Sequence, residues 1–388
     1  MKTSTLVTPA RATHSARGRF SPVRNLTPET LGRLLDAFHA GELAATARLW
    51  ESIEQRDDVL KAVAAKRKKA PGRFGWEIET YDSGEEAAAH AEALDYFYRH
   101  LTTADAVDGN YEGGFALLTR QMMDAVGKGY AVHEIVWQPQ ADGSLTARLA
   151  FVPLWFFENR TGRLRFLGSE GAREGTDLEP GGWLISTGDG LMEASSIAYL
   201  YKHLPLRDWL VYCERNGMPG VRGVTDAPPG SDEWEAALEA VRDFGAEFHA
   251  LMSRGTEIES IDLSSRSALP YPGLVERMDT AIVTLWRGAS MGTMTERGSG
   301  VTLQLREAKL IERDDAEHLS DLLHAQLDRW ILRYRFGEGT TPRAGIKVRH
   351  REAGLRDEQV EDVREIVAET LPQAVATFVK SFLPSQPG

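Results

Sequence analysis

Residues 270–300 read PYPGLVERMDTAIVTLWRGASMGTMTERGSG, and this stretch decides what kind of fold the second half of the chain adopts. Apolar side chains from Leu274 to Trp286 recur at three- and four-residue spacing, which predicts an amphipathic helix over 270–288. Glycine and hydroxyl residues dominate 289–300, so a loop is expected there. The second half is therefore predicted to consist of long helices joined by glycine-rich connections.

The same spacing predicts two helices before this stretch and one after it. The pattern over 191–215 is interrupted by Pro205 and ends at the breaker sequence 216–220. A serine caps a long helix over 231–254, and helical periodicity resumes over 300–336. Three shorter elements complete this half: strands at 257–263 and 346–350, and a charged helix from about 357.

The first half alternates helices with short strands. Thr27 precedes Pro28 at the start of a helical pattern, which is the arrangement of a capping residue before a proline in the first turn. An Ala-Asp-Gly turn at 141–143 between two apolar runs predicts a hairpin. The fold class is α+β, with antiparallel strands rather than repeated βαβ units. The predicted helices are 27–41, 43–53, 59–70, 85–101 and 115–126, and the strands are 74–80, 130–137, 144–152, 164–167 and 183–186.

Charge and hydropathy exclude two classes of protein. The 388 residues carry a net charge of −12, and because residues 1–24 hold five cations and no acid, the rest carries −17. Tight general DNA binding is disfavoured, since it depends on cations that displace counterions from phosphates. The longest apolar runs, such as 151–157, are far shorter than the roughly 18–20 residues of a membrane span.

Cysteine content and the basic segments have ordinary structural interpretations. Cys213 is the single cysteine, so an intrachain disulfide is excluded, a reducing compartment is favoured, and the residue is expected to pack within a helix. Residues 1–26 are expected to form a basic flexible arm, not a secretory signal, because no apolar segment follows. The basic cluster Lys66 to Lys69 is expected to be a solvated helix end.

No catalytic motif is complete. A phosphate-binding loop is absent, and the glycines at 127–129 and 298–300 predict turns. His133-Glu134 resembles the start of a zinc-protease motif, but position 137 is Trp, so a structural pair is expected. Acidic pairs such as Asp314-Asp315 are expected on solvated helix faces. No reaction class, metal or cofactor is predicted.

The long helices carry more apolar surface than the short strands obviously cover. One hypothesis is packing of helix on helix within one subunit. The other is that part of each stripe lies between identical subunits of a closed ring. Periodicity alone leaves both open.

The order of several motifs resembles the portal proteins of tailed phages, and within them the Mu-like portal family of phages and prophages. The matching segments are 56–60 with Arg67, Ala70-Pro71, Trp76-Glu77-Ile78, 129–137, Arg207-Asp208-Trp209, 214–223, 252–259 and the Gly-rich loop. The chain departs from the family pattern in a loop shortened to 287–290. The resemblance covers roughly residues 27–350.

The resemblance implies a portal-like architecture, with a mixed helix and antiparallel-strand wing and long stem and tunnel helices. It divides the chain into a flexible arm (1–26), a wing (27–190), a stem helix (191–215), a clip (216–230), a second stem helix (231–254), a wing strand (255–269), a tunnel helix with its loop (270–300), and a crown-ward helix with the C-terminal region (301–388).

The resemblance also implies function, partners and site residues. It implies a non-enzymatic subunit of a dodecameric ring at the capsid vertex of the virion, assembled in the host cytoplasm. The ring would pass double-stranded DNA during packaging and ejection, and would contact terminase, head–tail connector proteins, and the major capsid and scaffolding proteins. The channel residues would be Thr293, Thr295, Arg297, Ser299 and Gly300, the clip contacts Asn216, Gly217, Met218, Pro219 and Arg222, and the subunit-packing residues Trp234, Val241, Phe244 and Phe248.

Two alternatives from other classes remain open at this point. A phage-encoded metal-dependent hydrolase would use scattered acids around a metal ion. A DNA-binding adaptor would use the basic arm and Lys66 to Lys69.

Overall fold

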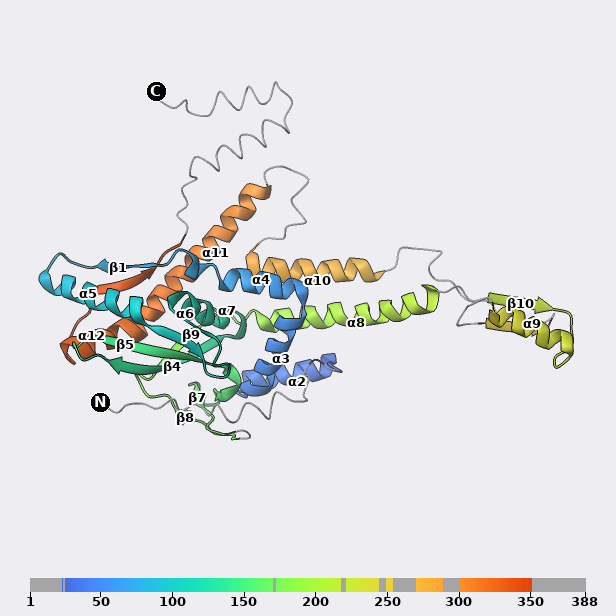
Figure 1. Cartoon of the computed structure of the whole chain (residues 1–388), viewed down its shortest axis with the longest axis horizontal. Helices are drawn as coiled ribbons and strands as arrows, with labels where there is room; N and C mark the ends of the chain where they lie inside the picture. The colour runs from blue at the N-terminus through green and yellow to red at the C-terminus, as the bar shows by residue number, and fades with distance from the viewer. Residues whose placement is uncertain are drawn as a thin grey trace, which may run out of the picture. The chain divides into compact units, whose positions relative to one another are not determined.

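Helices and strands are mixed throughout the part of the chain that the computed structural model describes, which is residues 23, 25–169, 172–217, 221–243, 249–253, 270–288 and 300–350 (Figure 1). The α+β class predicted from the sequence is confirmed at this level. The chain separates after Arg349 into two units, and the following description concerns the first of them.

Three helices open the described chain: α2 (Pro28–His39), α3 (Leu43–Arg56) and α4 (Asp58–Lys68). Two of them, α2 and α4, begin at a capping side chain. The Thr27 hydroxyl caps α2 by accepting from the backbone N–H of Thr30 at 3.2 Å. The Asp57 carboxylate caps α4 by accepting from the backbone N–H of Leu60 at 2.8 Å. These three helices confirm the predictions for this part of the sequence.

The largest sheet has five strands in the order β3-β2-β5-β4-β9. Only β2 and β5 pair in parallel, and the other neighbours are antiparallel. The predicted hairpin is confirmed as β4 and β5, whose turn contains Gly143 with a φ of 80°, a conformation that favours glycine. The strands are β2 (Thr102–Asp105), β3 (Glu112–Gly113), β4 (Tyr130–Pro139), β5 (Leu145–Val152) and β9 (Trp183–Thr187).

Two smaller sheets and three helices complete the body. A two-stranded antiparallel sheet joins β1 (Trp76–Thr80) to β12 (Ala344–Val348), and so links the beginning of the body to its end. A three-stranded sheet is formed by β6 (Phe157–Glu158), β7 (Arg165–Phe166) and β8 (Thr176–Asp177). The helices are α5 (Glu85–His100), α6 (Phe115–Met122) and α7 (Asp124–Lys128), with 3₁₀ turns at Pro71–Arg73 and Leu154–Phe156.

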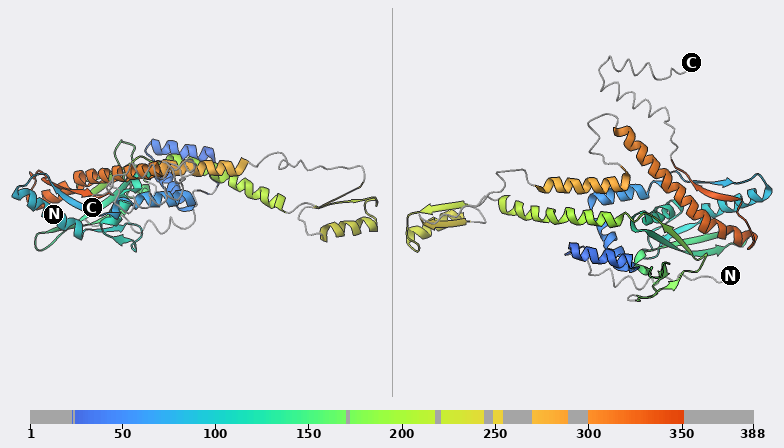
Figure 2. Two further views of the ribbon diagram at one scale, coloured as in Figure 1. Left: turned by 90° about the horizontal axis from the view of Figure 1, so that it is seen from above. Right: turned by 180° about the vertical axis from the view of Figure 1, so that it is seen from behind.

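Two long helices, α8 (Met192–Gly217) and α10 (Pro270–Arg287), run side by side (Figures 1 and 2). Pro205 does not interrupt α8, contrary to the prediction. Its missing N–H removes one hydrogen bond, and contacts to α10 from the turns before and after it hold the helix continuous.

A long helical stretch follows as α11 (Gly300–Leu323), the π-helical turn η4 (His324–Asp328) and α12 (Arg329–Phe336), which confirms the predicted helix over 300–336. Gln326 of η4 bonds both backbone groups of Ile185 on the edge strand β9, at 2.9 and 2.7 Å. The wider π turn therefore attaches this helix to the large sheet.

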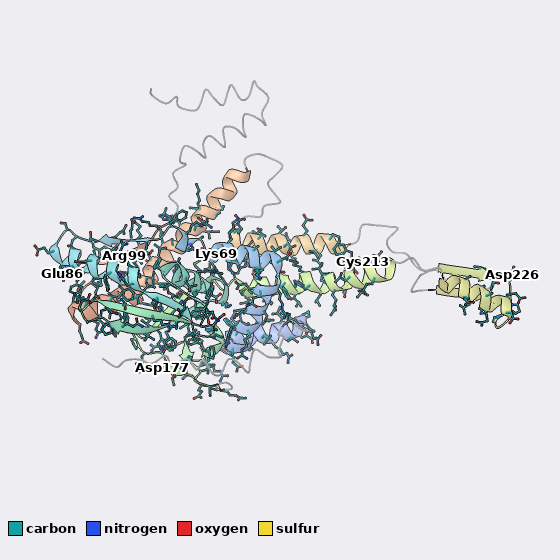
Figure 3. All side chains as sticks on the ribbon, viewed as in Figure 1. Lys69, Glu86, Arg99, Asp177, Cys213 and Asp226 are labelled. Carbon is teal, nitrogen blue, oxygen red and sulfur yellow. The ribbon has the colours of Figure 1, made fainter. Side chains whose placement is uncertain are left out.

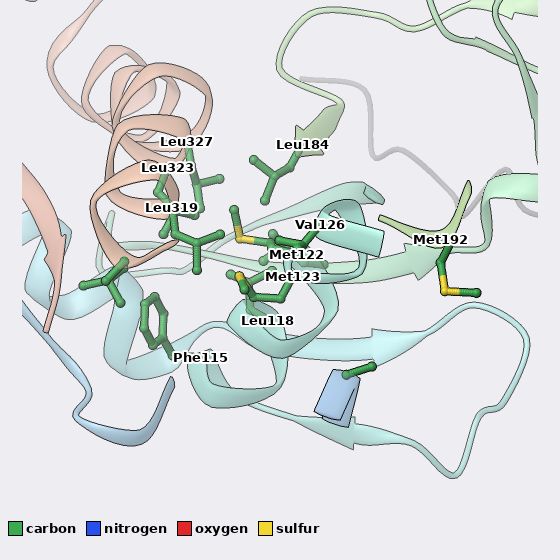
Figure 4. Packing of buried hydrophobic residues seen from close by; sticks show 14 of the residues in the cluster. Phe115, Leu118, Met122, Met123, Val126, Leu184, Met192, Leu319, Leu323 and Leu327 are labelled. Atoms are coloured by element: carbon green, nitrogen blue, oxygen red, sulfur yellow. The ribbon is translucent and has the colours of Figure 1, made fainter. Parts of the chain in front are cut away.

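One hydrophobic core joins helices from both ends of the described chain. Leu118 and Met122 of α6 pack in the same cluster as Leu319 and Leu323 of α11 (Figure 4). All four are buried almost completely. The first 130 residues and the last 50 of the described part are therefore a single folded body.

A small βαβ unit lies in the sequence between α8 and α10. It consists of β10 (Val221–Thr225), α9 (Asp232–Asp243) and β11 (His249–Ser253), with the two strands parallel and α9 in contact with both. The prediction of one helix over 231–254 is therefore wrong. The helix ends at Asp243, because the segment from His249 pairs with a strand 28 residues earlier in the sequence, a contact that helical periodicity cannot reveal.

Cys213 is also placed differently from the expectation. It lies exposed on α8 rather than packed (Figure 3). The predicted strand at 257–263 and the predicted helix from 357 lie outside the described residues.

Candidate functional site

The helices α8 and α10 form an antiparallel pair, and their contacts repeat every seven residues on α8 and every seven or eight on α10. Contacts between them recur every two turns on α8, and the matching positions on α10 run in the opposite direction. The contacts join Ser195 to Trp286, Lys202 to Asp279, and Trp209 to Tyr271. This spacing is that of a coiled-coil seam, in which residues seven apart return to the same face. We call this antiparallel pair of α8 and α10 the helix pair.

Trp286 anchors one end of the helix pair in the core. Its side chain is fully buried, and its indole Nε1–H donates to Oγ of Ser195 at 2.9 Å. The ring lies against Gly127 of α7, where a Cβ atom would stand only 3.0 Å from the indole. A glycine at that position therefore allows α7 and α10 to approach closely.

Lys202 fastens the middle of the helix pair. Its Nζ lies 2.6 Å from Oδ1 of Asp279 on α10, and 3.1 Å from carboxylate oxygens of Asp57 and of Asp58 at the start of α4. The Lys202 side chain is only 6% exposed. Burial by itself lowers the pKa of this ammonium, but the three carboxylates outweigh burial and raise it. One buried cation therefore joins three helices.

Asp57 has two tasks at this junction, since it caps α4 and pairs with the neighbouring cations. Burial raises the pKa of its carboxyl, but hydrogen bonds from His203, from the Leu60 N–H and from Lys202 outweigh burial and bring the pKa to about 2. The carboxylate is therefore charged at neutral pH, where it balances Lys202.

The basic cluster at the end of α4 is not a solvated helix end. The Arg67 guanidinium donates from Nε and Nη2 to the two carboxylate oxygens of Asp315 on α11, both at 2.9 Å. Lys68 Nζ lies 2.6 Å from Glu54 and 2.7 Å from Asp124. The prediction is wrong for these two residues, because their partners lie far away in the sequence. Lys66 and Lys69 are exposed, as predicted.

Asp315 corrects a second expectation, since it is buried rather than on a solvated helix face. The bidentate geometry of its contact with Arg67 gives direction as well as energy. This contact ties α11 to α4 and hence to the helix pair.

A second buried network stiffens the base of these helices. Lys128 Nζ of α7 lies 2.9 Å from Asp124 Oδ2 and 3.8 Å from Glu51 Oε2 of α3. Burial opposes the charge of Lys128, but Asp124 and Glu51 outweigh it and raise the Lys128 pKa. The helices α3, α4 and α7 therefore form one rigid support.

The end of α10 is fixed beside the middle of α11. The Gly288 N–H donates to the Thr284 carbonyl at 2.8 Å with φ at 75°, and a Cβ atom there would stand 3.0 Å from Ile311. From Gly300 to Ile311 the helix α11 extends about 16 Å beyond this point, at 1.5 Å per residue. The segment 289–299 therefore connects two firmly held helices.

The face of α8 opposite α10 has three exposed apolar side chains, and Leu204 on the same face is half-buried against the core. Ile197, Tyr201 and Val211 are 39%, 51% and 42% exposed. With Leu204 and Asp208 they follow alternating four- and three-residue steps, which places them on one stripe of the helix. We call these five residues the outer stripe of α8.

The site residues predicted from the sequence lie in different parts of the structure. Arg222 and Trp234 belong to the βαβ unit, with Val241 in the last turns of α9, and Asn216 and Gly217 end α8. Trp234 is half-buried, and its N–H donates to Ser231 Oγ at 3.2 Å. Gly300 begins α11. Eight of the predicted site residues lie outside the described residues: Met218, Pro219, Phe244, Phe248, Thr293, Thr295, Arg297 and Ser299.

Sequence reasoning missed Lys202, Asp279 and the outer stripe of α8. The signal was present, since 195, 202 and 209 are seven apart and 197, 201, 204, 208 and 211 alternate four- and three-residue steps. The interruption expected at Pro205 concealed both patterns.

The side chain of His133 has a structural role. Its Nε2 lies 3.2 Å from Oε1 of Gln121, and complete burial lowers its pKa to about 3, so the ring is neutral. Glu134 follows it on β4 and points to the other face of the sheet. No group of three or more metal-ligating side chains comes together among the described residues. None of the described helices is long and apolar enough to cross a membrane.

The geometry defines a scaffold, in which helices are fastened side by side by buried ion pairs and one apolar face is left open. Comparison with known families gives it an identity. The sequence model described as the portal protein of Mu bacteriophage matches residues 47–380. The chain therefore belongs to the Mu phage portal protein family.

Two curated relatives agree with this assignment. The Mu-like prophage FluMu protein gp29 of Haemophilus influenzae is 25% identical over 298 residues, which are 72% of this chain and 54% of the relative. The portal protein of Escherichia phage Mu is 23% identical over 285 residues, which are 70% of this chain and 53% of the relative. The chain spans about half the length of the curated relatives it matches.

Among solved structures, the chain is similar to a subunit in the neck of an empty gene transfer agent particle, with 10% identity and a TM-score of 0.46. That match covers 97% of this chain and all of the other. A subunit of the native gene transfer agent virion matches with 11% identity and a TM-score of 0.45, covering 97% and 99%.

Proposed function

We propose that this chain is a ring-forming portal subunit of a tailed phage or prophage. Copies close into a dodecameric ring at the capsid vertex of the virion, after assembly in the host cytoplasm. The ring conducts double-stranded DNA in packaging and ejection, and it offers docking surfaces to terminase, head–tail connector, major capsid and scaffolding proteins. The subunit has no catalytic role of its own. Membership of the Mu phage portal protein family supports this proposal.

The outer stripe of α8 is the observation that carries the proposal. The opposite face of the same helix is already satisfied by α10 and α4 through Ser195, Lys202 and Trp209. Large apolar side chains on a second face gain free energy only when another surface covers them, at about 25 cal/mol per Å² buried. A copy of the same chain, meeting this stripe with a different face, generates a closed ring.

We also propose a revised assignment of the portal parts. In this proposal the helix pair supplies the two stem helices, with α10 in place of the segment 231–254 as the second of them. The βαβ unit between them takes the place of the clip. The helices α11 and α12 lead toward the crown, and the sheets with α2 to α7 form the wing.

Electrostatics support passage of DNA rather than tight binding. Outside residues 1–24 the chain has a net charge of −17, which repels phosphates and avoids a deep binding well. The segment 289–299 has Arg297 as its only basic residue, so we propose that this connector lines the narrowest part of the channel. The firm fixing of α10 and α11 on both sides supports that role.

The two alternatives lose their specific support. An adaptor that grips DNA with Lys66 to Lys69 would need four available cations, but Arg67 and Lys68 are committed to Asp315, Glu54 and Asp124. A hydrolase that used the acidic pair Asp314-Asp315 would need both carboxylates available. The Asp315 carboxylate is instead paired with Arg67.

The test is a double substitution in the outer stripe, Ile197→Asp with Tyr201→Asp. Two buried unpaired carboxylates would each cost several kcal/mol in a subunit interface, so native mass spectrometry and negative-stain images should show single subunits in place of rings. The matched control is Leu210→Asp, an exposed apolar residue on the same helix but off the stripe, which should keep the rings. Intact rings from the double variant would contradict the proposal.

A further inference from the structure

The outer edge of β1 has unpaired backbone groups. The Arg349 N–H donates to the Gly75 carbonyl and the Tyr81 N–H donates to the Arg343 carbonyl, so odd-numbered residues of β1 face β12. The backbone N–H and C=O groups of Trp76, Ile78 and Thr80 therefore face away from β12. No hydrogen bond to these groups comes from a residue in the described ranges.

The other edge of the same sheet is closed by side chains. The Ile346 N–H donates to Oδ2 of Asp328 and the Val348 N–H to Oγ of Ser320, both at 2.9 Å. Asp328 is itself held by the Tyr98 hydroxyl at 2.6 Å. Because this edge is satisfied within the chain, β1 offers the place where the sheet can grow.

A groove of about 960 Å³ is lined by residues of β1 and α5, together with Arg349. One wall is 75–78 of β1, and the other is formed by residues of α5 such as Glu92 and Asp95. Trp76 and Tyr98 contribute aromatic surface. A groove between an edge strand and a helix is the geometry in which an extended peptide adds to a sheet, with main-chain hydrogen bonds on one side and side-chain contacts on the other.

The charged residues of β1 do not protect its edge. Charged side chains often discourage pairing at exposed strand edges. Here Glu77 and Glu79 lie on the strand face opposite to Trp76 and Ile78, and both are paired with cations of the β12 segment, Arg349 and Lys347. The backbone groups along the edge are left accessible.

The groove has a net negative charge. The Arg99 guanidinium (Figure 3) donates to both carboxylate oxygens of Asp95, at 2.6 and 2.9 Å, and also lies over the Trp76 ring. The Arg349 guanidinium donates to the Glu77 carboxylate. Glu92 has no ion-pair partner among the described residues and is exposed. The groove therefore favours a basic, extended segment.

We propose that this groove receives residues 1–22 of a neighbouring copy, which add a strand to the outer edge of β1. The stretch 3–8, TSTLVT, is rich in β-branched residues, and residues 1–22 contain four cations and no acid. The sequence thus combines strand propensity with the charge that the groove lacks. This inference rests on the proposed function, since it requires copies to lie side by side.

The placement of the two parts within the body favours exchange between copies. The helix α2, from which residues 1–22 depart, packs on α3 and α8, whereas β1 packs on α5 and β12. The two lie on different sides of the body (Figures 1 and 2). In a head-to-tail ring one side of each copy faces the other side of the next, so an arm on one side and its acceptor on the other are brought together.

Hydrogen exchange of assembled rings, resolved to single amides by mass spectrometry, tests the strand. The amides of Ile78 and Thr80 should be protected in the wild type and exchange at least 100-fold faster in the variant Thr5→Pro with Val7→Pro, because proline removes the donors of the added strand. The amides of Glu77 and Glu79, which face β12, should not change and serve as the internal control. Equal exchange of Ile78 in both proteins would overturn the inference.

Crosslinking tests the exchange between copies. In a Cys213→Ser background, Leu6→Cys protein is assembled with Glu92→Cys protein and treated with a bis-maleimide of about 10 Å span. Because each copy holds one cysteine, a crosslink across the groove forms only between copies. We expect covalent dimers, and fewer when Glu86→Cys, an exposed α5 residue outside the groove, replaces Glu92→Cys. Intact rings without dimers would overturn the exchange alone, whereas absence of rings would contradict the proposed function.

Discussion

The two faces of α8 differ in how their interactions are completed. The face toward α10 combines a buried tryptophan–serine hydrogen bond, Trp286 to Ser195, with the buried cation Lys202 and its three carboxylates. The opposite face, the outer stripe, is largely apolar, exposed and without such polar locks. Polar contacts in a dry environment fix geometry, because each unpaired partner is costly.

The difference teaches which contacts are made during folding and which are reserved for assembly. The inner face determines the register of α8 on α10 through contacts seven residues apart. Burial of the outer stripe would stabilise an assembly, and it does not depend on one particular polar partner. Substitutions on the inner face should therefore change the stability of the subunit, and those on the outer stripe should change assembly.

Trp286→Ala should have the largest effect on stability. Removing a fully buried indole and leaving a cavity should lower the free energy of unfolding by about 3–5 kcal/mol, measured by chemical denaturation. Trp286→Phe keeps most of the volume and loses the bond to Ser195, so a smaller loss is expected. A loss below about 1 kcal/mol for the alanine variant would show that the inner face does not hold the pair.

Lys202→Met should lower the free energy of unfolding by about 3 kcal/mol, because Asp57 and Asp279 are left without their shared cation. Arg207→Met is the matched control, since its pair with Asp208 is exposed and should contribute less than about 0.5 kcal/mol. If both variants unfold at the same denaturant concentration, the buried cluster does not fasten the helices.

Asp57→Asn tests how much the negative charge of Asp57 contributes to the stability of the inner face. Asparagine also caps helices well, so the start of α4 is kept while the pairing with Lys202 is weakened. The folded-state pKa of Asp57 is lowered from 3.8 to about 2, so its stabilising effect is present above pH 3.8 and is lost as pH falls toward 2. Unfolding measured from pH 5 to 2 should show this loss in the wild type and a flatter profile in the variant; identical profiles would contradict it.

Arg297→Ala should have the smallest effect on the subunit. The residue lies in the connector between α10 and α11, so stability should stay within about 0.5 kcal/mol and rings should form. DNA packaging or retention should change, because the connector loses its single cation. Unaltered packaging would show that this residue does not meet DNA.

Local patterns predicted much of the fold, and contacts distant in sequence explain the failures. The helices α2 to α4 and the hairpin of β4 and β5 follow from capping residues, periodicity and a glycine turn within about 20 residues. Periodicity wrongly predicts helix at β11, because the partner strand β10 lies on the other side of α9 in the sequence. Its five residues, His249–Ser253, show no alternation of their own.

The site was less predictable for the same reason. Lys68 is paired with Asp124, and Arg67 with Asp315, 248 residues further on. A basic run on one helix end cannot indicate such partners, so it is expected to be solvated. The outer stripe of α8 follows a local rule, and a heptad search across Pro205 would have found it.

Mass photometry and negative-stain imaging of the purified wild-type protein test the central claim most directly. The account predicts closed annular particles with a central hole, with the outer stripe of each α8 covered by a neighbour. A compact single subunit that persists at the concentrations of capsid assembly would contradict it.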